Sequence, residues 1–170
     1  MRVGASWNYA CLLVDPCNRE IAGRSAGPGK DVRLVKPAFA TPSFPISGIG
    51  AFHTDRDSEF ANAEIDLMPE AFGIERSLST KGCPLRQRRR RVDQQEAEGE
   101  HVHRETFGTT RELRAKFSDY AHRYNKFRIH STLGYMSPVE FRKGGCPSQN
   151  RPKSVTNPTR DLVGIAVPTE

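Results

Sequence analysis

Short apolar runs separated by turn residues occupy the first half of the chain, and they predict the strands of a sheet. Residues 7–14 are almost continuously apolar, which is typical of a buried strand. The word Asp-Pro-Cys-Asn at 15–18 predicts a turn, and residues 20–25 are the expected hairpin partner. Two further strands are predicted at residues 49–53, after a loop rich in proline and glycine, and at residues 73–77.

Apolar residues at helical spacing predict helices in three other places. A pattern that begins at residue 30 contains Pro37, and one at residues 62–72 contains Pro69. A proline inside a helix removes a backbone hydrogen bond and costs about 3 kcal/mol. The strongest pattern, with Leu113, Phe117 and Tyr124 on one face, follows the capping word Thr-Thr-Arg-Glu at 109–112. Residues 86–103 have no apolar stripe, so they indicate either a disordered segment or a solvated helix.

Asp55 lies just past the strand predicted at 49–53. Ligand sites in open α/β sheets favour the carboxyl ends of strands, and Mg²⁺ prefers carboxylate oxygens alongside substrate phosphates. Asp55 is therefore a candidate Mg²⁺ ligand. The alternative is a solvated loop aspartate that caps the following helix, and this residue alone does not decide between them.

Several words of the sequence, in series, resemble those of a known family. They are Trp-Asn-Tyr-Ala-Cys-Leu-Leu-Val-Asp at 7–15, Asn-Arg-Glu-Ile at 18–21, His-Thr-Asp-Arg at 53–56, Gly-Ile-Glu-Arg-Ser-Leu-Ser at 73–79, Lys-Gly-Cys-Pro at 81–84, and much of 124–141. Together they resemble the catalytic core of bacterial insertion-sequence transposases, which belong to the retroviral-integrase superfamily. The resemblance covers about residues 5–143. It implies an α/β, RNase H-like fold in which helices flank a mixed sheet.

The resemblance also implies an Asp-Asp-Glu triad that binds Mg²⁺, and this chain departs from that triad twice. Asp55 stands at the second Asp, but Arg91 occupies the position of the Glu. The word of the first Asp, Asp-x-Thr-Tyr, is absent upstream of residue 7, so we expect a sheet that lacks its first strand. Phosphoryl transfer by two metal ions needs converging carboxylates, and an arginine repels a cation. We therefore expect no productive Mg²⁺ binding and no strand transfer.

A shift of reading frame explains the arginine-rich word at residues 86–92. Relatives continue after Gly-Cys-Pro with a word such as Asp-Asn-Ala-Val-Ala-Glu-Ser, which carries the Glu on a helix. Written as GAC AAC GCC GTC GCC GAG TCG and read one base early after a C, this word becomes Arg-Gln-Arg-Arg-Arg-Arg-Val, as found here. We hypothesise a frameshift across residues 86–100, compensated before His101. The alternative is an arginine-rich insert that evolved as such.

The net charge of +6 indicates an anionic partner, but its source is uneven. Five arginines between residues 86 and 91 supply five of those six charges, so the charge is weak support for inherited DNA binding. The four cysteines have no metal-binding spacing and predict reduced thiols in a cytoplasmic protein. The apolar run at residues 9–14 is far too short to span a bilayer, and no membrane association is expected.

These observations predict one domain over residues 1–145, with an altered segment at 86–100, and a disordered tail over residues 146–170. We favour a transposase core-like protein, a degenerate copy without strand-transfer activity, with DNA and a second copy or a full-length transposase as partners. The alternatives are a non-catalytic nucleic-acid-binding protein and a transposase completed by another chain or by programmed frameshifting. The residues predicted to contact nucleic acid are Arg86, Arg88, Arg89, Arg90, Arg91, Lys126, Arg128 and His130. For the last three, structural docking of their segment is the alternative.

Overall fold

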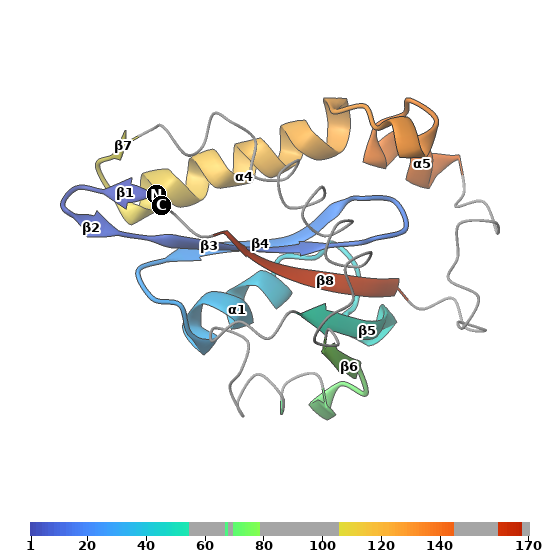
Figure 1. Ribbon diagram of the computed structural model, residues 1–170, viewed down its shortest axis with the longest axis horizontal. Helices are drawn as coiled ribbons and strands as arrows, with labels where there is room; N and C mark the ends of the chain where they lie inside the picture. The colour runs from blue at the N-terminus through green and yellow to red at the C-terminus, as the bar shows by residue number, and fades with distance from the viewer. Residues whose placement is uncertain (55–66, 68–69, 79–105, 145–159, 168–170) are drawn as a thin grey trace.

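A computed structural model of the chain describes residues 1–54, 67, 70–78, 106–144 and 160–167. Its main element is a mixed sheet of five strands (Figure 1). In chain order the strands are β3 Tyr9–Val14, β4 Ile21–Gly27, β5 Ile49–Thr54, β6 Glu75–Leu78 and β8 Arg160–Val167. Their order in space is β4-β3-β8-β5-β6, with β8 antiparallel to β3 and parallel to β5.

The hairpin of β3 and β4 is closed by a turn that side-chain oxygens hold. Asp15 Oδ1 accepts a hydrogen bond from the Cys17 N–H at 2.9 Å, and Asn18 Oδ1 accepts one from the Glu20 N–H at 2.9 Å. Arg19, between them, has a left-handed φ of 60°. Aspartate and asparagine favour turns because their side chains satisfy nearby backbone groups. The turn predicted at residues 15–18 is confirmed.

Helix α1, Val32–Phe39, forms where the apolar pattern predicts it, although it contains Pro37. The Asp31 side chain caps the helix by accepting a hydrogen bond from the Arg33 N–H at 2.9 Å. Its buried residues pack on one face of the sheet, and the rings of Phe39 and Phe52 meet edge-on at 4.9 Å. The 3-10 turn η1, Ile46–Gly48, then leads into β5. In so short a helix Pro37 removes one hydrogen bond, and burial of the apolar face offsets the loss.

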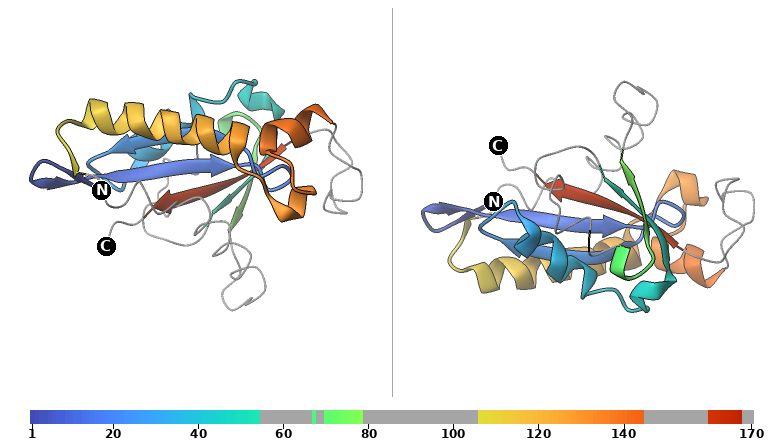
Figure 2. Two further views of the ribbon diagram at one scale, coloured as in Figure 1. Left: turned by 90° about the horizontal axis from the view of Figure 1, so that it is seen from above. Right: turned by 90° about the horizontal axis from the view of Figure 1, so that it is seen from below.

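Helix α4, Thr110–Phe127, covers the opposite face of the sheet (Figure 2). Thr109 Oγ1 caps it by accepting from the Glu112 N–H at 3.1 Å, and the Glu112 carboxylate accepts from the Gly108 N–H at 3.0 Å. The buried stripe of the helix is Leu113, Phe117, Ala121 and Tyr124, and it packs against Ala10, Leu12, Val14, Ile21 and Ala26 of the sheet. The predicted helix and its buried face are confirmed.

The end of α4 is fixed to β4 by one amide side chain. Asn125 Oδ1 accepts a hydrogen bond from the Ile21 N–H at 2.8 Å, and Asn125 Nδ2 donates one to the Ile21 carbonyl at 2.9 Å. Farther along β4, Arg114 Nε donates to the Ala26 carbonyl at 2.8 Å. Because β4 is an edge strand of the sheet, these bonds satisfy backbone groups that no neighbouring strand pairs.

Helix α5, Pro138–Lys143, follows the 3-10 turn η2, Ser131–Leu133. Ser137 and Glu140 form a capping box, in which the Glu140 carboxylate accepts a hydrogen bond from the Ser137 N–H at 2.9 Å. That bond, with a second from the Ser137 hydroxyl, holds the pKa of Glu140 below its ordinary value. Arg142 Nη1 lies 3.3 Å from the Glu20 carboxylate in the β3–β4 turn. This ion pair ties α5 to the end of the hairpin.

A second, three-stranded sheet joins the chain start to the residues before α4. Its strands are β1 Arg2–Val3, β2 Ser6–Trp7 and β7 Thr106–Phe107, in the order β2-β1-β7. Gly4 makes the turn between β1 and β2 with a φ of 57°, a conformation that glycine adopts without strain. Strands of two residues have no hydrophobic alternation, which explains why the sequence does not predict this sheet.

Strand β8 corrects one expectation, the disordered tail at residues 146–170. Residues 160–167 form a full strand, and it fills the central position of the sheet between β3 and β5. The run from Leu162 to Val167 is apolar apart from one glycine, a composition typical of a strand covered on both faces. The polar, proline-rich residues before it obscure this pattern. The remainder of the predicted tail lies outside the described residues.

The other predictions have mixed outcomes. Strand β6 confirms the short strand predicted at residues 73–77. The helix predicted at 62–72 is described only at residues 67 and 70–72, and the segment 86–103 lies outside the described residues. Cys11 is reduced and buried, but Cys17 is disulfide-bonded, which corrects the expectation of reduced thiols for that residue. Sequence spacing did not indicate this bond because disulfides depend on proximity in space.

Candidate functional site

The end of β5 is the first candidate site, because the predicted metal ligand follows it directly. Thr54 is the last residue of β5 and is fully buried. Asp55 is the next residue in the chain and lies outside the described residues, as do the five predicted arginines from Arg86 to Arg91. The described part of this candidate site is therefore limited to Thr54 and the strands on either side of it.

On one side lies β8, and its register decides which residue reaches the end of β5. Phe52 pairs with Leu162 and His53 with Val163. Because parallel strands advance together, Gly164 lies level with Thr54. Asp161, the only acidic residue of β8, pairs instead with Ala51. Three residues separate these levels, which is about 10 Å along a strand, so β8 brings no carboxylate to the end of β5.

On the other side lies β6, which brings a cation. Arg76 is opposite Phe52 in the β5–β6 ladder, and its Nη2 donates a long hydrogen bond of 3.5 Å to Thr54 Oγ1. A guanidinium is permanently charged, and its field opposes a divalent cation nearby. Where the resemblance implies converging carboxylates, Thr54 pairs with Leu78 of β6 and accepts a hydrogen bond from the Arg76 guanidinium.

The described part of the chain does not by itself supply a set of ligands for a divalent metal ion. Magnesium takes oxygen ligands, chiefly carboxylates and water. Among residues 1–54, 67, 70–78, 106–144 and 160–167, no three His, Cys, Asp or Glu side chains are grouped closely enough to hold a metal. At the end of β5 the described polar groups are the Thr54 hydroxyl and the Arg76 guanidinium.

The second candidate site is the C-terminal end of α4, where cations and apolar residues alternate. Lys126 and Arg128 are exposed, and so are Phe127 at 66% and Ile129 at 63%. Lys126 Nζ lies 5.4 Å from the centre of the Phe127 ring, and the Arg128 guanidinium lies 5.5 Å from the centre of the Tyr124 ring. Cations beside exposed apolar and aromatic surface are what a nucleic-acid strand requires, since phosphates bind the cations and bases stack on rings.

The segment after α4 separates the predicted contact residues into two groups. His130 is 5% exposed, its ring packs against Tyr124 at 5.3 Å, and its backbone pairs with Met136. Its burial favours the structural role for His130. Tyr135, by contrast, is 74% exposed and has a left-handed φ of 61°, which is strained for a bulky residue. Sequence reasoning missed Phe127 and Tyr135, although the alternation of cation and apolar residue from Lys126 onward was visible.

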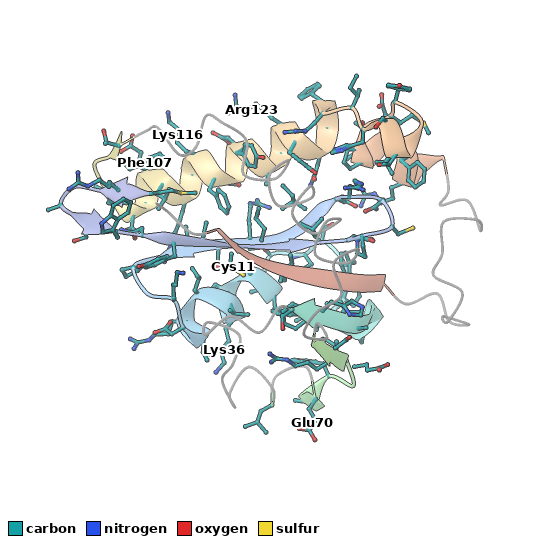
Figure 3. All side chains as sticks on the ribbon, in the orientation of Figure 1. Cys11, Lys36, Glu70, Phe107, Lys116 and Arg123 are labelled. Atoms are coloured by element: carbon teal, nitrogen blue, oxygen red, sulfur yellow. The ribbon has the colours of Figure 1, made fainter. Side chains whose placement is uncertain are left out.

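Positive charge is concentrated on the α4–α5 layer, which we define as residues 106–144. This layer contains eight basic and three acidic residues, a net charge of +5. Residues 1–54 have six basic and three acidic residues, a net charge of +3. Lys116 and Arg123 project from α4 away from the sheet, whereas Lys36 lies on the α1 side (Figure 3). The positive net charge of the chain therefore does not come from the arginines at residues 86–91 alone.

Comparisons with known proteins agree with this architecture. The sequence profile of the family described as "Integrase core domain" matches residues 97–144. The transposase InsF of insertion sequence IS3A from Escherichia coli strain K12 is 26% identical over 146 residues, which cover 83% of this chain and 50% of that protein. The transposase of insertion sequence element IS904 from Lactococcus lactis is 27% identical over 139 residues, 79% of this chain and 54% of that protein. The chain spans about half the length of these relatives.

The fold has a match among solved structures. The catalytic core domain of BIV integrase superposes with a TM-score of 0.54, covering 89% of this chain and 94% of that one, at 13% sequence identity. The mixed sheet with helices on both faces is thus the α/β, RNase H-like fold of an integrase core, as predicted. In sequence, the chain is similar to an integrase core profile and to insertion-sequence transposases, and in fold it is similar to an integrase catalytic core.

Proposed function

We propose that this chain is a transposase core-like protein that binds DNA but does not carry out metal-dependent strand transfer. The observation that carries the proposal is the register of β8. It sets Gly164 level with Thr54 and leaves Asp161 level with Ala51. The central strand, where the resemblance implies the first catalytic Asp, therefore brings no acidic residue to the end of β5.

The chemistry explains why this loss abolishes activity. Joining of polynucleotides in this superfamily relies on two divalent ions, which activate the attacking oxygen and stabilise the leaving one. By the resemblance, Asp55 corresponds to the second Asp, and Arg91 stands at the position of the Glu. The Arg76 guanidinium lies beside Thr54, and its positive charge opposes a cation at that end of β5. The chain is then a degenerate copy of an active core.

We propose a frameshift across residues 86–100 as the origin of this state. The matched profile begins at residue 97 and continues to residue 144. The arginine-rich word at 86–92 lies upstream of that match. The match therefore begins four residues before His101, where the proposed shift returns to the original frame. The nucleotide sequence of codons 80–105 tests the origin directly.

DNA is the proposed partner, and the end of α4 is the proposed contact. Lys126 and Arg128 are exposed side by side with Phe127 and Ile129, and the α4–α5 layer carries a net charge of +5. Cations at a helix C-terminus also interact favourably with the helix dipole. Stabilisation of α4 is therefore the alternative to DNA contact for these two residues. A second copy or a full-length transposase remains a proposed protein partner, and the proposed location is cytoplasmic. No helix in the described part of the chain is long and apolar enough to cross a membrane.

Strand transfer is tested with purified protein, Mg²⁺ or Mn²⁺, and an oligonucleotide that carries the ends of a related insertion sequence. We expect neither cleavage nor joining, because one acidic residue does not hold two metal ions. The matched control is Asp55→Ala, which should behave as the unchanged chain does. Turnover that Asp55→Ala abolishes would refute the proposal.

DNA binding is tested by fluorescence anisotropy across a range of salt concentrations. We expect the Lys126→Ala/Arg128→Ala double variant to bind more weakly and to reduce the slope of log affinity against log salt by about 2, since two phosphate contacts are lost. Lys36→Ala on the α1 side is the matched control and should leave the slope unchanged. An unchanged slope in the double variant would assign these two residues a structural role.

The alternative is a non-catalytic nucleic-acid-binding protein that uses the arginine-rich word. Arginine-rich segments bind nucleic acid through phosphate contacts and can order on it. Replacing Arg86, Arg88, Arg89, Arg90 and Arg91 by alanine separates the two proposals. Loss of binding in this variant, with normal binding by Lys126→Ala/Arg128→Ala, would favour the alternative.

A further inference from the structure

Exposed hydrophobic side chains gather at the end of α4 and in the turn that follows it. They are Phe127, Ile129, Tyr135 and Met136, and they make up most of the large hydrophobic residues that are exposed in the described part of the chain. Single exposed hydrophobic residues are common on protein surfaces, whereas a group of them marks a binding surface. We call residues 127–136 the aromatic turn.

Backbone hydrogen bonds fold the aromatic turn back on itself. The Tyr135 N–H donates to the His130 carbonyl at 2.9 Å, and the His130 N–H donates to the Met136 carbonyl at 3.1 Å. The side chains of His130 and Leu133 are buried and anchor the turn. The fold therefore brings Tyr135 beside a residue that is only three positions after Phe127.

Tyr135 is held in its exposed position by a strained backbone. Its φ is 61°, directly after Gly134 with a φ of 70°. Bulky residues rarely adopt this conformation, and it persists where the surrounding structure imposes it, commonly at functional sites. Because hydrogen bonds fix the turn before any partner binds, the ring loses little conformational freedom on binding. Tyr135 is therefore a preformed contact surface.

The charge around the aromatic turn favours an anionic partner. Residues 120–139 contain three basic residues, Arg123, Lys126 and Arg128, and no aspartate or glutamate. All three basic residues are exposed. Lys126 Nζ lies 5.4 Å from the centre of the Phe127 ring. A group that can bind a phosphate thus lies next to a ring on which a base can stack.

A peptide and a DNA duplex fit this surface less well than a single strand does. Peptides commonly bind along an open strand edge, but the backbone of His130 is already paired with Met136. In a duplex the bases are stacked on one another, and reaching their faces requires unstacking at a cost in free energy. Unpaired bases expose these faces and stack on aromatic side chains. The exposed rings of Phe127 and Tyr135 therefore match unpaired bases.

We propose that the aromatic turn binds single-stranded DNA. Unpaired bases stack on Phe127 and Tyr135, and the adjoining phosphates contact Lys126 and Arg128. The proposal rests on the DNA contact proposed for the end of α4 and specifies the form of DNA that binds there. Stacking distinguishes it from phosphate contact alone, because phosphate contact requires no aromatic ring.

Substitutions that keep an apolar side chain and remove only the ring test the stacking. The full chain and its Phe127→Leu and Tyr135→Leu variants are compared by fluorescence anisotropy on three DNA probes of equal length. The probes are a thymine single strand, a duplex, and an abasic single strand that has the same phosphates without bases. We expect each variant to bind the thymine strand about five- to 150-fold more weakly, the effect of losing one stacked base. Binding of the duplex and of the abasic strand should be unchanged.

Two further variants serve as controls. Tyr135→Phe keeps the ring and should bind the thymine strand as the unchanged chain does. Phe72→Leu removes an exposed ring that lies before β6, outside the aromatic turn, and should have no effect on any probe. Because all the substituted side chains are exposed, the far-UV circular dichroism of the variants should match that of the unchanged chain.

The outcomes for stacking and for phosphate contact can be distinguished. If Lys126→Ala/Arg128→Ala weakens binding of every probe but both leucine variants bind the thymine strand normally, phosphate contact stands and stacking is overturned. Equal losses of the leucine variants on the thymine and abasic strands would also overturn stacking, because the effect would not depend on bases. If only the leucine variants lose affinity, and only for the thymine strand, stacking stands and the phosphate contact of Lys126 and Arg128 fails. Equal displacement of the thymine strand from the unchanged chain and from the leucine variants by an acidic, apolar peptide would overturn the proposal in favour of a peptide partner.

Discussion

The α4–α5 layer and the centre of the sheet show two ways in which one fold is held. In the layer, side chains specify each junction: Thr109 begins α4, Asn125 fixes its end to β4, and Arg142 ties α5 to Glu20. At the centre of the sheet, β8 is held by backbone ladders on both sides. The layer depends on particular residues, whereas the centre depends on pattern and direction.

This difference between side-chain junctions and backbone ladders explains how a fold can be kept when a site on it changes. A central strand needs backbone pairing and apolar residues in the correct alternation, and the segment at 160–167 supplies both. A metal centre at the end of β5 would also need a carboxylate, and the acidic residue of β8, Asp161, pairs with Ala51 rather than with the end of β5. Many sequences can therefore form a central strand, whereas few of them place a metal ligand at the required position.

Loss of the central strand is the strongest test of the comparison. Val163→Pro places a proline where β8 pairs with both Val14 and His53. Because proline has no N–H and disrupts a central ladder, we expect the free energy of unfolding to fall by at least about 3 kcal/mol. Urea unfolding followed by circular dichroism measures the loss.

Val163→Ile is the control for this change, because it keeps the backbone N–H and a branched side chain. It should cost less than about 1.5 kcal/mol. Equal stability of the proline variant and the unchanged chain would show that β8 contributes little to the sheet.

The specific junctions of the layer give the next largest effect. Asn125→Ala removes both hydrogen bonds to Ile21 and leaves a backbone donor and acceptor of an edge strand unpaired. We expect the free energy of unfolding to fall by about 2–3 kcal/mol. The neighbouring Lys126→Ala, at an exposed position, should change it by less than about 0.5 kcal/mol. Similar free energies of unfolding for the two variants would show that the hydrogen bonds between Asn125 and Ile21 do not stabilise the fold.

Local features of the sequence predicted local features of the fold. The capping word at 109–112 and the spacing of Leu113, Phe117 and Tyr124 predicted α4, and turn chemistry predicted the β3–β4 turn. These patterns depend on residues close in the chain. The contact of Asn125 with Ile21 joins positions far apart in sequence, and no local pattern announces it.

The candidate sites show the same limit. The apolar run at 162–167 is visible in the sequence, but its pairing with β3 brings together opposite ends of the chain. The proline-rich residues before this run led to the prediction of a disordered tail. The run nevertheless forms a strand because it pairs with β3 and β5. His130 and Arg128 share one basic, aromatic stretch, yet the fold buries the first and exposes the second. The sequence identified the stretch, but only the fold shows that His130 is buried against the Tyr124 ring while Arg128 contacts the same ring from an exposed position.

The start of α5 is expected to contribute less than the Asn125 clamp. Ser137→Ala removes the hydroxyl that accepts from the Glu140 N–H, and loss of such a cap costs about 1 kcal/mol. Ser131→Ala is a matched control, because Ser131 is exposed and begins the short turn η2. A cost in the control as large as in Ser137→Ala would indicate a general effect of serine removal in this segment.

The same capping box predicts a small dependence on pH. Hydrogen bonds from Ser137 hold the pKa of Glu140 below its ordinary value in the folded chain. The stabilisation is therefore fully present above the ordinary glutamate pKa, about 4.3, and is lost as the pH falls through the lower folded value. We expect the unchanged chain to be more stable than Glu140→Gln near neutral pH and to lose this advantage in acid. Urea unfolding at a series of pH values measures the difference, and a constant difference across the series would show that the charge of Glu140 plays no part in the cap.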